Sequence, residues 1–214
     1  MKSKFVMSLA VLLCTFGCTY EAQFEPAYVP SEAPSFLAYG KIALVMRGEQ
    51  REFTYEGPPD SEVGDFTTLI VPVGEIVRNI AHQVFGNCFS EGVEFVETLE
   101  QARGYTVALT GNMEGFIYRY RRVIDQGFTS EEAQTWITPE VEVTFNVAAY
   151  NSDGDVLLDD TYASGVQSGE SYQVTTRASE RINEALHATL HALMLEVAAD
   201  LRPKLVGECE ITDL

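Results

Sequence analysis

Hydrophobic residues recur along this chain with helical spacing in two stretches. In residues 73–85 an apolar stripe advances by three or four residues at a time, which predicts an amphipathic helix that Gly86 and Asn87 end. A second stripe predicts a longer helix over residues 176–201, which Pro203 ends. The two stripes consist of Val73, Ile76, Val77, Ile80 and Val84, and of Ile182, Leu186, Leu190, Leu193, Val197 and Leu201.

Between these helices the pattern alternates, as in strands with one buried face. It predicts a strand over residues 140–150, an Asp-Gly hairpin turn over residues 151–155 and a returning strand over residues 156–163. Residues 93–98 predict a further strand, and residues 105–124 predict two shorter strands separated by a glycine-containing segment.

The first half of the body has its own strand pattern. Residues 36–46 and 51–56 are rich in strand formers and predict a hairpin, and residues 66–72 predict a buried strand that leads into the first helix. Residues 127–138 are polar and predict an insertion. Trp136, the only tryptophan, falls in this insertion and either anchors an interface or covers the edge of its own core.

These elements predict a single α+β domain over residues 36–214. Each helix has one apolar stripe, and the alternating strands have one apolar face, which is what two packed layers require. We therefore expect a two-layer domain in which a mainly antiparallel sheet carries both long helices on one face.

The chain begins with the pattern of an export signal. Two lysines precede an apolar run over residues 5–13, which is shorter than the roughly 20 residues of a membrane span. Gly17 stands directly before Cys18 and gives a small residue at the cut and a thiol that can carry a lipid. We expect a signal peptide over residues 1–17 and lipid attachment at Cys18.

The segment after this cysteine predicts a tether. Residues 18–35 contain Pro26, Pro30 and Pro34 at intervals of four, which prevents a helix and favours extended, semi-rigid backbone. Such a tether would hold the folded body away from the membrane surface. Because Tyr20 and two further aromatic residues accompany the prolines, the alternative is that part of the segment lies along the domain.

Composition changes the picture by excluding one class of partner. The 214 residues include 32 acidic and 14 basic side chains, which gives a net charge of −18. This excess repels nucleic acid at long range and argues against polynucleotide binding. A hydrophobic share of 46% indicates a folded body rather than a disordered chain.

Two cysteines remain if the signal is removed and Cys18 is lipidated. Cys88 and Cys209 have no metal-type spacing, and in an exported protein such a pair most often forms a disulfide. The alternative is two unpaired thiols. Sequence alone leaves both readings open, because it does not give the distance between the two Cα atoms.

One short segment concentrates positive charge. Arg119, Arg121 and Arg122 lie within one predicted strand, and alternation places Arg119 and Arg121 on the face opposite Tyr118 and Tyr120. Such a row is a candidate contact for the phosphate or carboxylate of an anionic ligand or an acidic partner. The alternative is a charged strand face that discourages edge-to-edge pairing.

Other motifs indicate no metal site and no catalysis. His187 and His191 have the spacing of zinc ligands, but they lie off the apolar stripe and lack the glutamate of HExxH, so they are predicted to lie at the surface. Residues 151–155 suggest a calcium loop, yet the glycine stands one place too early, and a hairpin explains them better. No nucleophile elbow or phosphate loop is present. We expect no metal, no cofactor and no enzymatic activity.

Three segments carry a family resemblance: LIVPVGEIVRNIAHQVF at residues 69–85, GDVLLDDTYASG at residues 154–165 and INEALHATLHALMLEVAADL at residues 182–201. By these segments the chain resembles the small envelope lipoproteins of Gram-negative bacteria, of the YajG type and of the auxiliary type in transport and polysaccharide-export systems. The resemblance implies a lipid-anchored protein that faces the periplasm and has an envelope protein as partner. Thr19 after the lipidated cysteine is similar to members sorted to the outer membrane.

The expected function is therefore that of a non-enzymatic lipoprotein that acts by binding, as an accessory of an envelope system. The alternative is a soluble exported ligand-binding protein or enzyme with a pocket between the sheet and the helices. In this alternative signal peptidase cuts elsewhere, since Thr15 and Phe16 stand where an aliphatic and a small residue are typical of a lipoprotein signal. The oligomeric state is left open.

Overall fold

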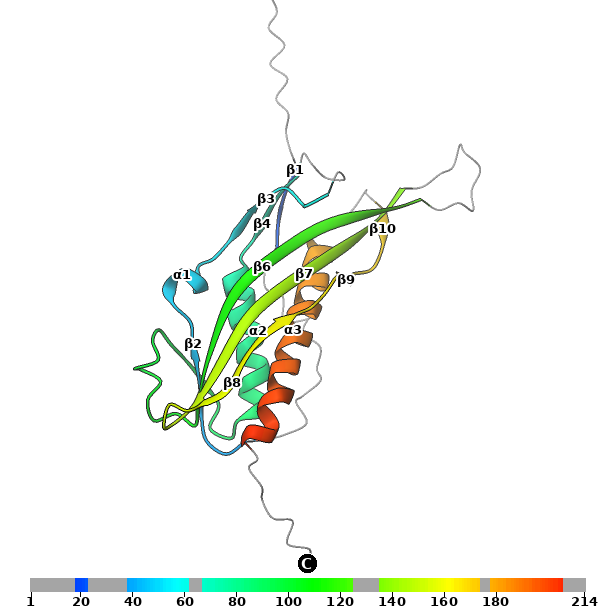
Figure 1. Cartoon of the computed structure of the whole chain (residues 1–214). Helices are drawn as coiled ribbons and strands as arrows, with labels where there is room; N and C mark the ends of the chain where they lie inside the picture. The colour runs from blue at the N-terminus through cyan, green and yellow to red at the C-terminus, as the bar shows by residue number, and fades with distance from the viewer. Residues whose placement is uncertain (1–17, 23–37, 62–66, 125–134, 174–177, 206–214) are drawn as a thin grey trace, which may run out of the picture.

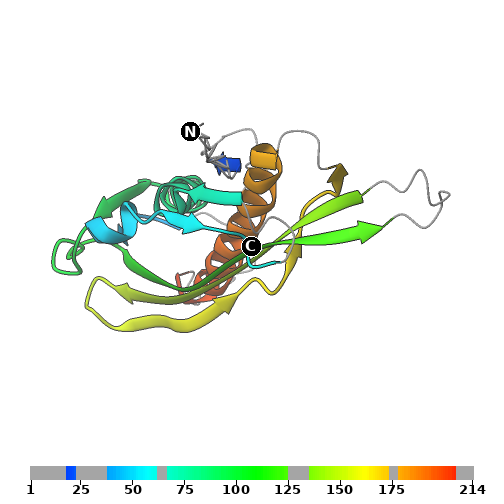
Figure 2. The same cartoon turned by 90° about the horizontal axis from the view of Figure 1, so that it is seen from above.

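The computed structural model describes residues 18–22, 38–61, 67–124, 135–173 and 178–205. In this part of the chain two sheets and two long helices form an α+β fold, with both helices on the same side of the larger sheet (Figure 1). Seen from above, two long strands run beneath the helices and extend beyond them (Figure 2). None of the helices in the described ranges combines the length and the apolar content of a membrane span.

The larger sheet is built around β6 (Val107–Ile124) and β7 (Thr135–Asn151), which pair antiparallel along almost their whole length. On one side β2 (Ile42–Val45) lies parallel to β6, and β5 (Val93–Val96) lies parallel to β2. On the other side β7 pairs antiparallel with β8 (Val156–Ala163), β9 (Gln167–Ser168) and β10 (Tyr172–Gln173).

The smaller sheet has three strands. β4 (Thr67–Val71) lies at its centre, between β1 (Cys18–Glu21), which is parallel to it, and β3 (Tyr55–Gly57), which is antiparallel. Leu69 and Val71 of β4 are fully buried, and the strand leads through one residue into the first long helix. The predicted strand–helix unit is therefore present.

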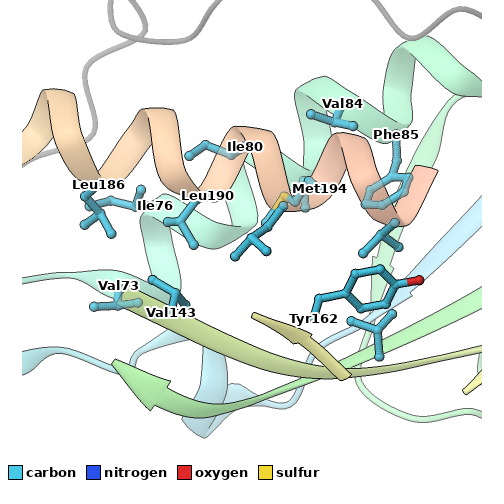
Figure 3. Packing of buried hydrophobic residues seen from close by; sticks show 14 of the residues in the cluster. Val73, Ile76, Ile80, Val84, Phe85, Val143, Tyr162, Leu186, Leu190 and Met194 are labelled. Atoms are coloured by element: carbon cyan, nitrogen blue, oxygen red, sulfur yellow. The ribbon is translucent and has the colours of Figure 1, made fainter. Parts of the chain in front are cut away.

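The helices are α1 (Gly48–Arg51), a single turn, and the long α2 (Val73–Cys88) and α3 (Ala178–Leu205). The side chains between α2, α3 and the sheet form the main core (Figure 3). Full burial of each large aliphatic side chain contributes roughly 1.5–3 kcal/mol. The predicted stripes supply these residues: Val73, Ile76, Ile80 and Val84 from α2, and Ile182, Leu186, Leu190, Leu193, Val197 and Leu201 from α3.

The end of α3 differs from the prediction. Pro203 does not end the helix but lies inside its last turn, and the helix continues to Leu205. A proline removes one backbone donor and clashes with the carbonyl four residues earlier. Only Lys204 and Leu205 follow Pro203 in the helix, so the disturbance is confined to its C-terminal end.

The prediction of one mainly antiparallel sheet is wrong. β2 is parallel to both of its neighbours, and the three-stranded sheet is separate from the larger one. Residues 36–46 and 51–56 form no hairpin, since β2 joins the larger sheet whereas β3 joins the smaller one. The chain between them turns into α1, so two non-local pairings replace the local one.

Residues 105–124 also differ from the prediction, because they form one strand instead of two. A bulge between Met113 and Gly115 takes up the glycine-containing segment without interrupting the pairing with β7. The predicted insertion over residues 127–138 is shorter than expected, because Thr135 already begins β7. Residues 125–134 lie outside the described part of the chain.

The predicted hairpin turn after β7 is confirmed. Asn151 Oδ1 accepts hydrogen bonds from the backbone N–H groups of Asp153, at 3.0 Å, and of Asp155, at 2.8 Å. Gly154 adopts a φ of 88°, in the left-handed region that favours glycine. The acidic residues of this segment therefore belong to a turn between β7 and β8.

The predicted tether does not begin at residue 18. Residues Cys18–Glu21 pair with β4, Ala22 is fully buried, and Tyr20 packs against the core. The alternative, in which part of the segment lies along the domain, is confirmed for these residues. The three prolines and the predicted signal peptide lie outside the described part of the chain.

The prediction of surface histidines is wrong. His187 and His191 are only 0% and 4% exposed. α3 contacts β1 and β9 as well as α2, β7 and β8, so the helix is covered well beyond its predicted stripe. Burial lowers the pKa of His187 from 6.5 to about 4, which keeps its imidazole neutral near neutral pH.

We predict that His187 makes the fold less stable in mild acid. The unfolded chain binds a proton at this residue with a pKa near 6.5, whereas the folded chain binds it only near 4. The contribution of neutral His187 to the free energy of unfolding is thus complete above pH 6.5 and is lost as the pH falls toward 4. Between about pH 7 and about pH 5 the loss is about 2 kcal/mol. Urea unfolding of wild type and His187→Leu at both pH values measures it.

The difference between the two pH values should be about 2 kcal/mol smaller for His187→Leu than for wild type. His82 on α2 is exposed, so His82→Leu is the matched control and should keep the wild-type pH dependence. Equal pH dependence in His187→Leu and wild type would contradict the prediction.

Candidate functional site

A pocket of about 420 Å³ opens between the long helices and the larger sheet. Strands β2, β6, β7 and β8 form its floor, and α2 and α3 form its walls. α1 and Phe53 form its lip, close to the point where β2 ends. The pocket thus lies where sequence analysis placed the pocket of the alternative function.

The interior of the pocket is apolar and buried. Phe85 of α2, Tyr162 of β8 and Met194 of α3 line it, and Figure 3 shows these three side chains between the helices and the sheet. Phe95 and Phe145 add half-buried aromatic rings. The buried lining side chains, each at most 9% exposed, are Leu44, Val73, Ala81, Phe85, Leu109, Val147, Tyr162, Leu193, Met194 and Val197.

The pocket exists because β2 is short. β2 pairs with β6 from Ile42 to Val45, and β6 then continues to Ile124 without this neighbour. The chain leaves the sheet after Val45 and forms α1 above the opening. Gln50 Nε2 of α1 donates a hydrogen bond to the backbone oxygen of Gly111 at 3.0 Å, so a side chain meets the edge of β6 where the strand pairing stops.

Gly74 allows α1 to pack closely against α2, because it has no Cβ atom. A Cβ atom at Gly74 would clash with the backbone oxygen of Gln50 and would lie 2.6 Å from that of Arg51. The Gly74 N–H donates to the backbone oxygen of Phe53 at 2.9 Å. This close contact fixes the lip of the pocket on the first turn of α2.

Two arginines bring positive charge to the pocket. Arg47 lies on the exposed lip, with Nη1 3.4 Å from Oε1 of Glu49. Arg78 lies half-buried on α2, and no carboxylate of the described residues is within ion-pair distance of it. Asn112 and Gln50 add neutral polar groups to the lining.

Tyr162 contributes the tyrosine side chain of the buried pocket lining. Its hydroxyl donates a hydrogen bond to Oδ2 of Asp200 at 2.9 Å. Burial and this bond to a carboxylate raise the pKa of Tyr162 well above its ordinary value. The hydroxyl therefore stays protonated and does not act as a base near neutral pH.

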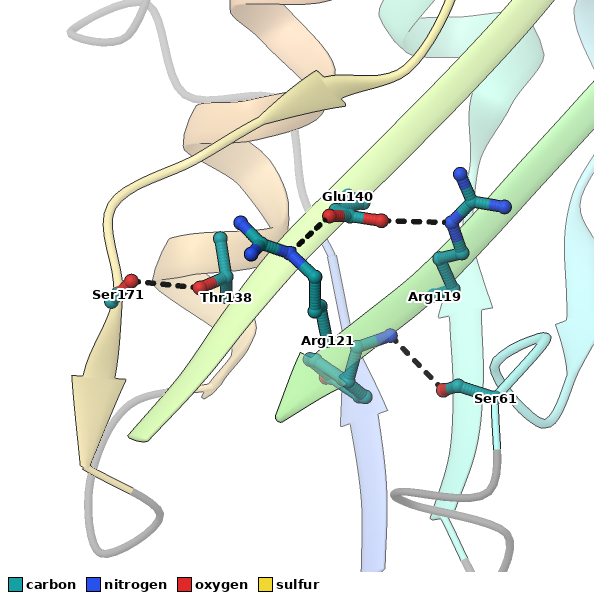
Figure 4. A network of polar contacts seen from close by, with 7 residues as sticks. Ser61, Arg119, Arg121, Thr138, Glu140 and Ser171 are labelled. Atoms are coloured by element: carbon teal, nitrogen blue, oxygen red, sulfur yellow. Dashed lines mark hydrogen bonds and ion pairs between the residues drawn. The ribbon is translucent and has the colours of Figure 1, made fainter. Parts of the chain in front are cut away.

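The structure brings Arg119 and Arg121 together, as predicted, and both pair with the same carboxylate. Glu140 of β7 is 8% exposed and accepts hydrogen bonds from Nε of Arg119 at 2.9 Å and from Nε of Arg121 at 2.6 Å (Figure 4). Burial alone would raise the pKa of Glu140, but the two guanidinium groups outweigh it and lower the pKa. The interpretation as a charged strand face explains this pair of arginines better than an anion site does.

Arg122 and Trp136 do not complete a site with these arginines. Arg122 is opposite Ile137 in the register, so alternation places it on the helix-facing side, away from Arg119. Trp136 lies in β7 rather than in a loop, opposite Val123 and beside Gln173 of β10. Trp136 is half-buried on a strand of the sheet, so the fold does not present it as an interface anchor in a loop.

Cys88 offers no reactive thiol. Cys88 is fully buried and free, its Sγ donates to the backbone oxygen of Val84 at 3.2 Å, and burial raises the pKa of its thiol to about 12. The structure thus shows no disulfide at Cys88, and the predicted partner Cys209 lies outside the described part of the chain. The described residues contain no group of three metal-ligating side chains.

Comparison with known proteins assigns no family to the chain. No family model matches the chain, and no curated protein matches it by sequence. Among solved structures it is similar to a Xanthomonas campestris protein of the DUF330 family, with 12% identity and a TM-score of 0.46 over 84% of this chain and 91% of that one.

Two further solved structures are similar at a lower level. PelC from Paraburkholderia phytofirmans, solved as a dodecamer, has 18% identity and a TM-score of 0.35 over 80% of this chain and 93% of its own. A minor lipoprotein from Acinetobacter baumannii has 14% identity and a TM-score of 0.27 over 77% and 92%. At these values the likeness assigns neither a family nor a function, and the resemblance to YajG-type lipoproteins stays a prediction.

Sequence reasoning did not identify the pocket residues, although α2 carried a signal. Beside its core stripe the helix has a second stripe with spacings of three and four residues, which faces the pocket. This stripe consists of Gly74, Val77, Arg78, Ala81 and Phe85. A helix with two adjacent apolar stripes is wide enough to contact both a neighbouring helix and a cavity.

We predict that Gly74→Ala destabilises the fold by roughly 1–3 kcal/mol, because the new methyl group must displace the backbone of α1. Urea unfolding measures the change. Gly86→Ala on the same helix is the matched control, since its Cβ would meet only Val93 Cγ1 at an ordinary 3.6 Å. This control should be neutral or stabilising by up to about 1 kcal/mol. Equal stability of the two variants would contradict the close contact at Gly74.

Proposed function

We propose that this chain is a bacterial envelope lipoprotein whose folded body binds an apolar small molecule without catalysing a reaction. The observation that carries the proposal is the pocket, which combines a buried apolar interior with a polar lip. Its volume of about 420 Å³ lies in the range of sites for small ligands, and such sites are mostly apolar with a few polar groups. The proposal joins the expected lipoprotein to the alternative of a ligand-binding pocket.

The lining favours binding over catalysis. A catalytic site pairs a nucleophile or acid with a base within hydrogen-bond reach. The ionisable groups that line this pocket are Arg47, Glu49, Arg78 and Tyr162. Glu49 pairs with Arg47, and Tyr162 donates to Asp200, so neither is poised as a base toward the interior.

The anchoring part of the proposal rests on Cys18 and its position in the fold. Cys18 is the first residue of β1 and lies opposite Thr67 of β4. A lipid on this residue would hold the folded body directly at a membrane surface, without an intervening tether. An outer-membrane location facing the periplasm, and a role as accessory to an envelope protein partner, are further parts of this proposal.

We predict that Cys18→Ala releases the protein from the membrane fraction into the soluble exported fraction. The substitution removes the thiol that would carry the lipid, so the anchor is lost. Cell fractionation followed by immunoblotting measures the distribution. Cys14→Ala, within the predicted signal peptide, is the matched control and should stay in the membrane fraction. If Cys18→Ala is retained with the membranes, the chain is not anchored at this residue.

We predict that Val77→Phe weakens ligand binding, because the larger side chain extends from α2 into the pocket. The probe is N-phenyl-1-naphthylamine, a neutral apolar dye whose fluorescence rises in apolar surroundings. It is titrated into the exported full chain carrying Cys18→Ala, with the circular dichroism of each variant as a check of folding. We expect saturable binding by the parent and at least about a tenfold loss in the variant, which corresponds to about 1.4 kcal/mol.

Val156→Phe is the matched control for this experiment. Val156 is 60% exposed on β8 and does not line the pocket, so the same substitution should leave binding unchanged. Absence of saturable binding by the parent, or equal binding by folded Val77→Phe, would refute the proposed function.

A further inference from the structure

We infer that the ligand of this pocket is an anionic amphiphile, with a single apolar chain in the interior and a carboxylate or phosphate group at Arg78. The inference rests on the proposed function and adds the chemical class of the ligand. Its basis is a half-buried arginine in a largely apolar lining, without a carboxylate of the described residues as partner.

The position of Arg78 on α2 singles it out. Val73, Ile76, Ile80 and Val84 form the core stripe of α2 and are at most 2% exposed. The adjacent stripe lines the pocket, and Arg78 stands in its middle, between Gly74 and Val77 on one side and Ala81 and Phe85 on the other. At this place an apolar side chain would continue the lining without interruption.

A charge in such a place is costly unless something compensates it. Arg78 is partly buried as a residue, and no hydrogen bond or ion pair with the described residues compensates its charge. An apolar ligand that fills the pocket would remove more of this water. If the ligand carries an anion, it restores charge-assisted hydrogen bonds to Arg78, and a guanidinium group is well suited to a carboxylate or a phosphate.

Most of the other described basic side chains have a carboxylate partner, so a half-buried arginine without one is unusual in this acidic protein. With 32 acidic and 14 basic residues, the chain has an excess of carboxylates for pairing. Among the described residues, Arg103 and Lys204 also lack an ion pair, but both are exposed to water. The basic side chains with a carboxylate partner are Lys41, Arg47, Arg51, Arg119, Arg121 and Arg181.

The lip supports the same orientation of the ligand. Arg47, Gln50 and Asn112 line the open side of the pocket, whereas the buried residues of β6, β7 and α3 line its interior. The net charge of −18 repels anions at a distance, so local contacts must select an anionic ligand. An apolar chain therefore points inward, and its charged end stays near α1 and α2.

Displacement of N-phenyl-1-naphthylamine by two ligands with the same chain tests this inference. Dodecanoic acid and dodecan-1-ol differ in head group, and at about pH 8 the acid is ionised. In the exported full chain carrying Cys18→Ala we expect the acid to displace the dye at concentrations at least about tenfold lower than the alcohol. Arg78→Gln should abolish this preference while dye binding persists.

Two further variants separate charge from shape. Arg78→Lys keeps the charge and should retain most of the preference for the acid. Arg103→Gln removes an exposed charge that does not line the pocket, and it should leave the preference unchanged.

The outcomes separate the inference from the proposed function. If the dye binds and both ligands displace it equally in the parent, or if Arg78→Gln keeps the preference, the anionic head group is refuted while the apolar pocket stands. If neither the dye nor the two ligands bind, the proposed function fails, and the inference fails with it.

Discussion

The antiparallel pairing of β6 with β7 is the constraint on which the other elements depend. It runs from Val107 opposite Asn151 to Ile124 opposite Thr135, and the helices pack against one of its faces. The bulge at Met113 and Gly115 shifts the alternation by one residue. As a result Tyr118 is only 1% exposed beneath the helices, while Arg119 faces outward to Glu140. Without the shift, the apolar and charged side chains of β6 after Gly115 would exchange the two faces of the sheet.

The elements that depend on local periodicity could be predicted from the sequence. The stripe of α2 and the Asn151 turn are set by residues a few positions apart, so the sequence contains their cause. The parallel pairing of β2 with β5 joins segments separated by two helices and two strands, and no local pattern encodes it. The burial of His187 was missed for a similar reason, because α3 also contacts β1 and β9, which are not its neighbours in the local pattern.

The candidate site shows the same division. Alternation correctly placed Arg119 and Arg121 on one face, but their ion pairs with Glu140 depend on the register of β7. The pocket itself depends on where β2 stops, and hydrophobic pattern determines strand ends poorly. Arg78 could have been noticed as a charge beside an apolar stripe, yet its meaning requires knowing that a cavity faces it.

A continuous path of rigid contacts connects the residue proposed for lipid attachment with the lip of the pocket. Cys18 begins β1, which pairs in register with β4, and β4 leads directly into α2. The first turn of α2 carries Gly74, against which the backbone of α1 is packed. Because each step is a paired strand, a direct chain connection or a close backbone contact, an anchor at Cys18 would also orient the opening of the pocket relative to the membrane. A long flexible tether would remove this orientation, and the pairing of β1 with β4 leaves no room for one before residue 22.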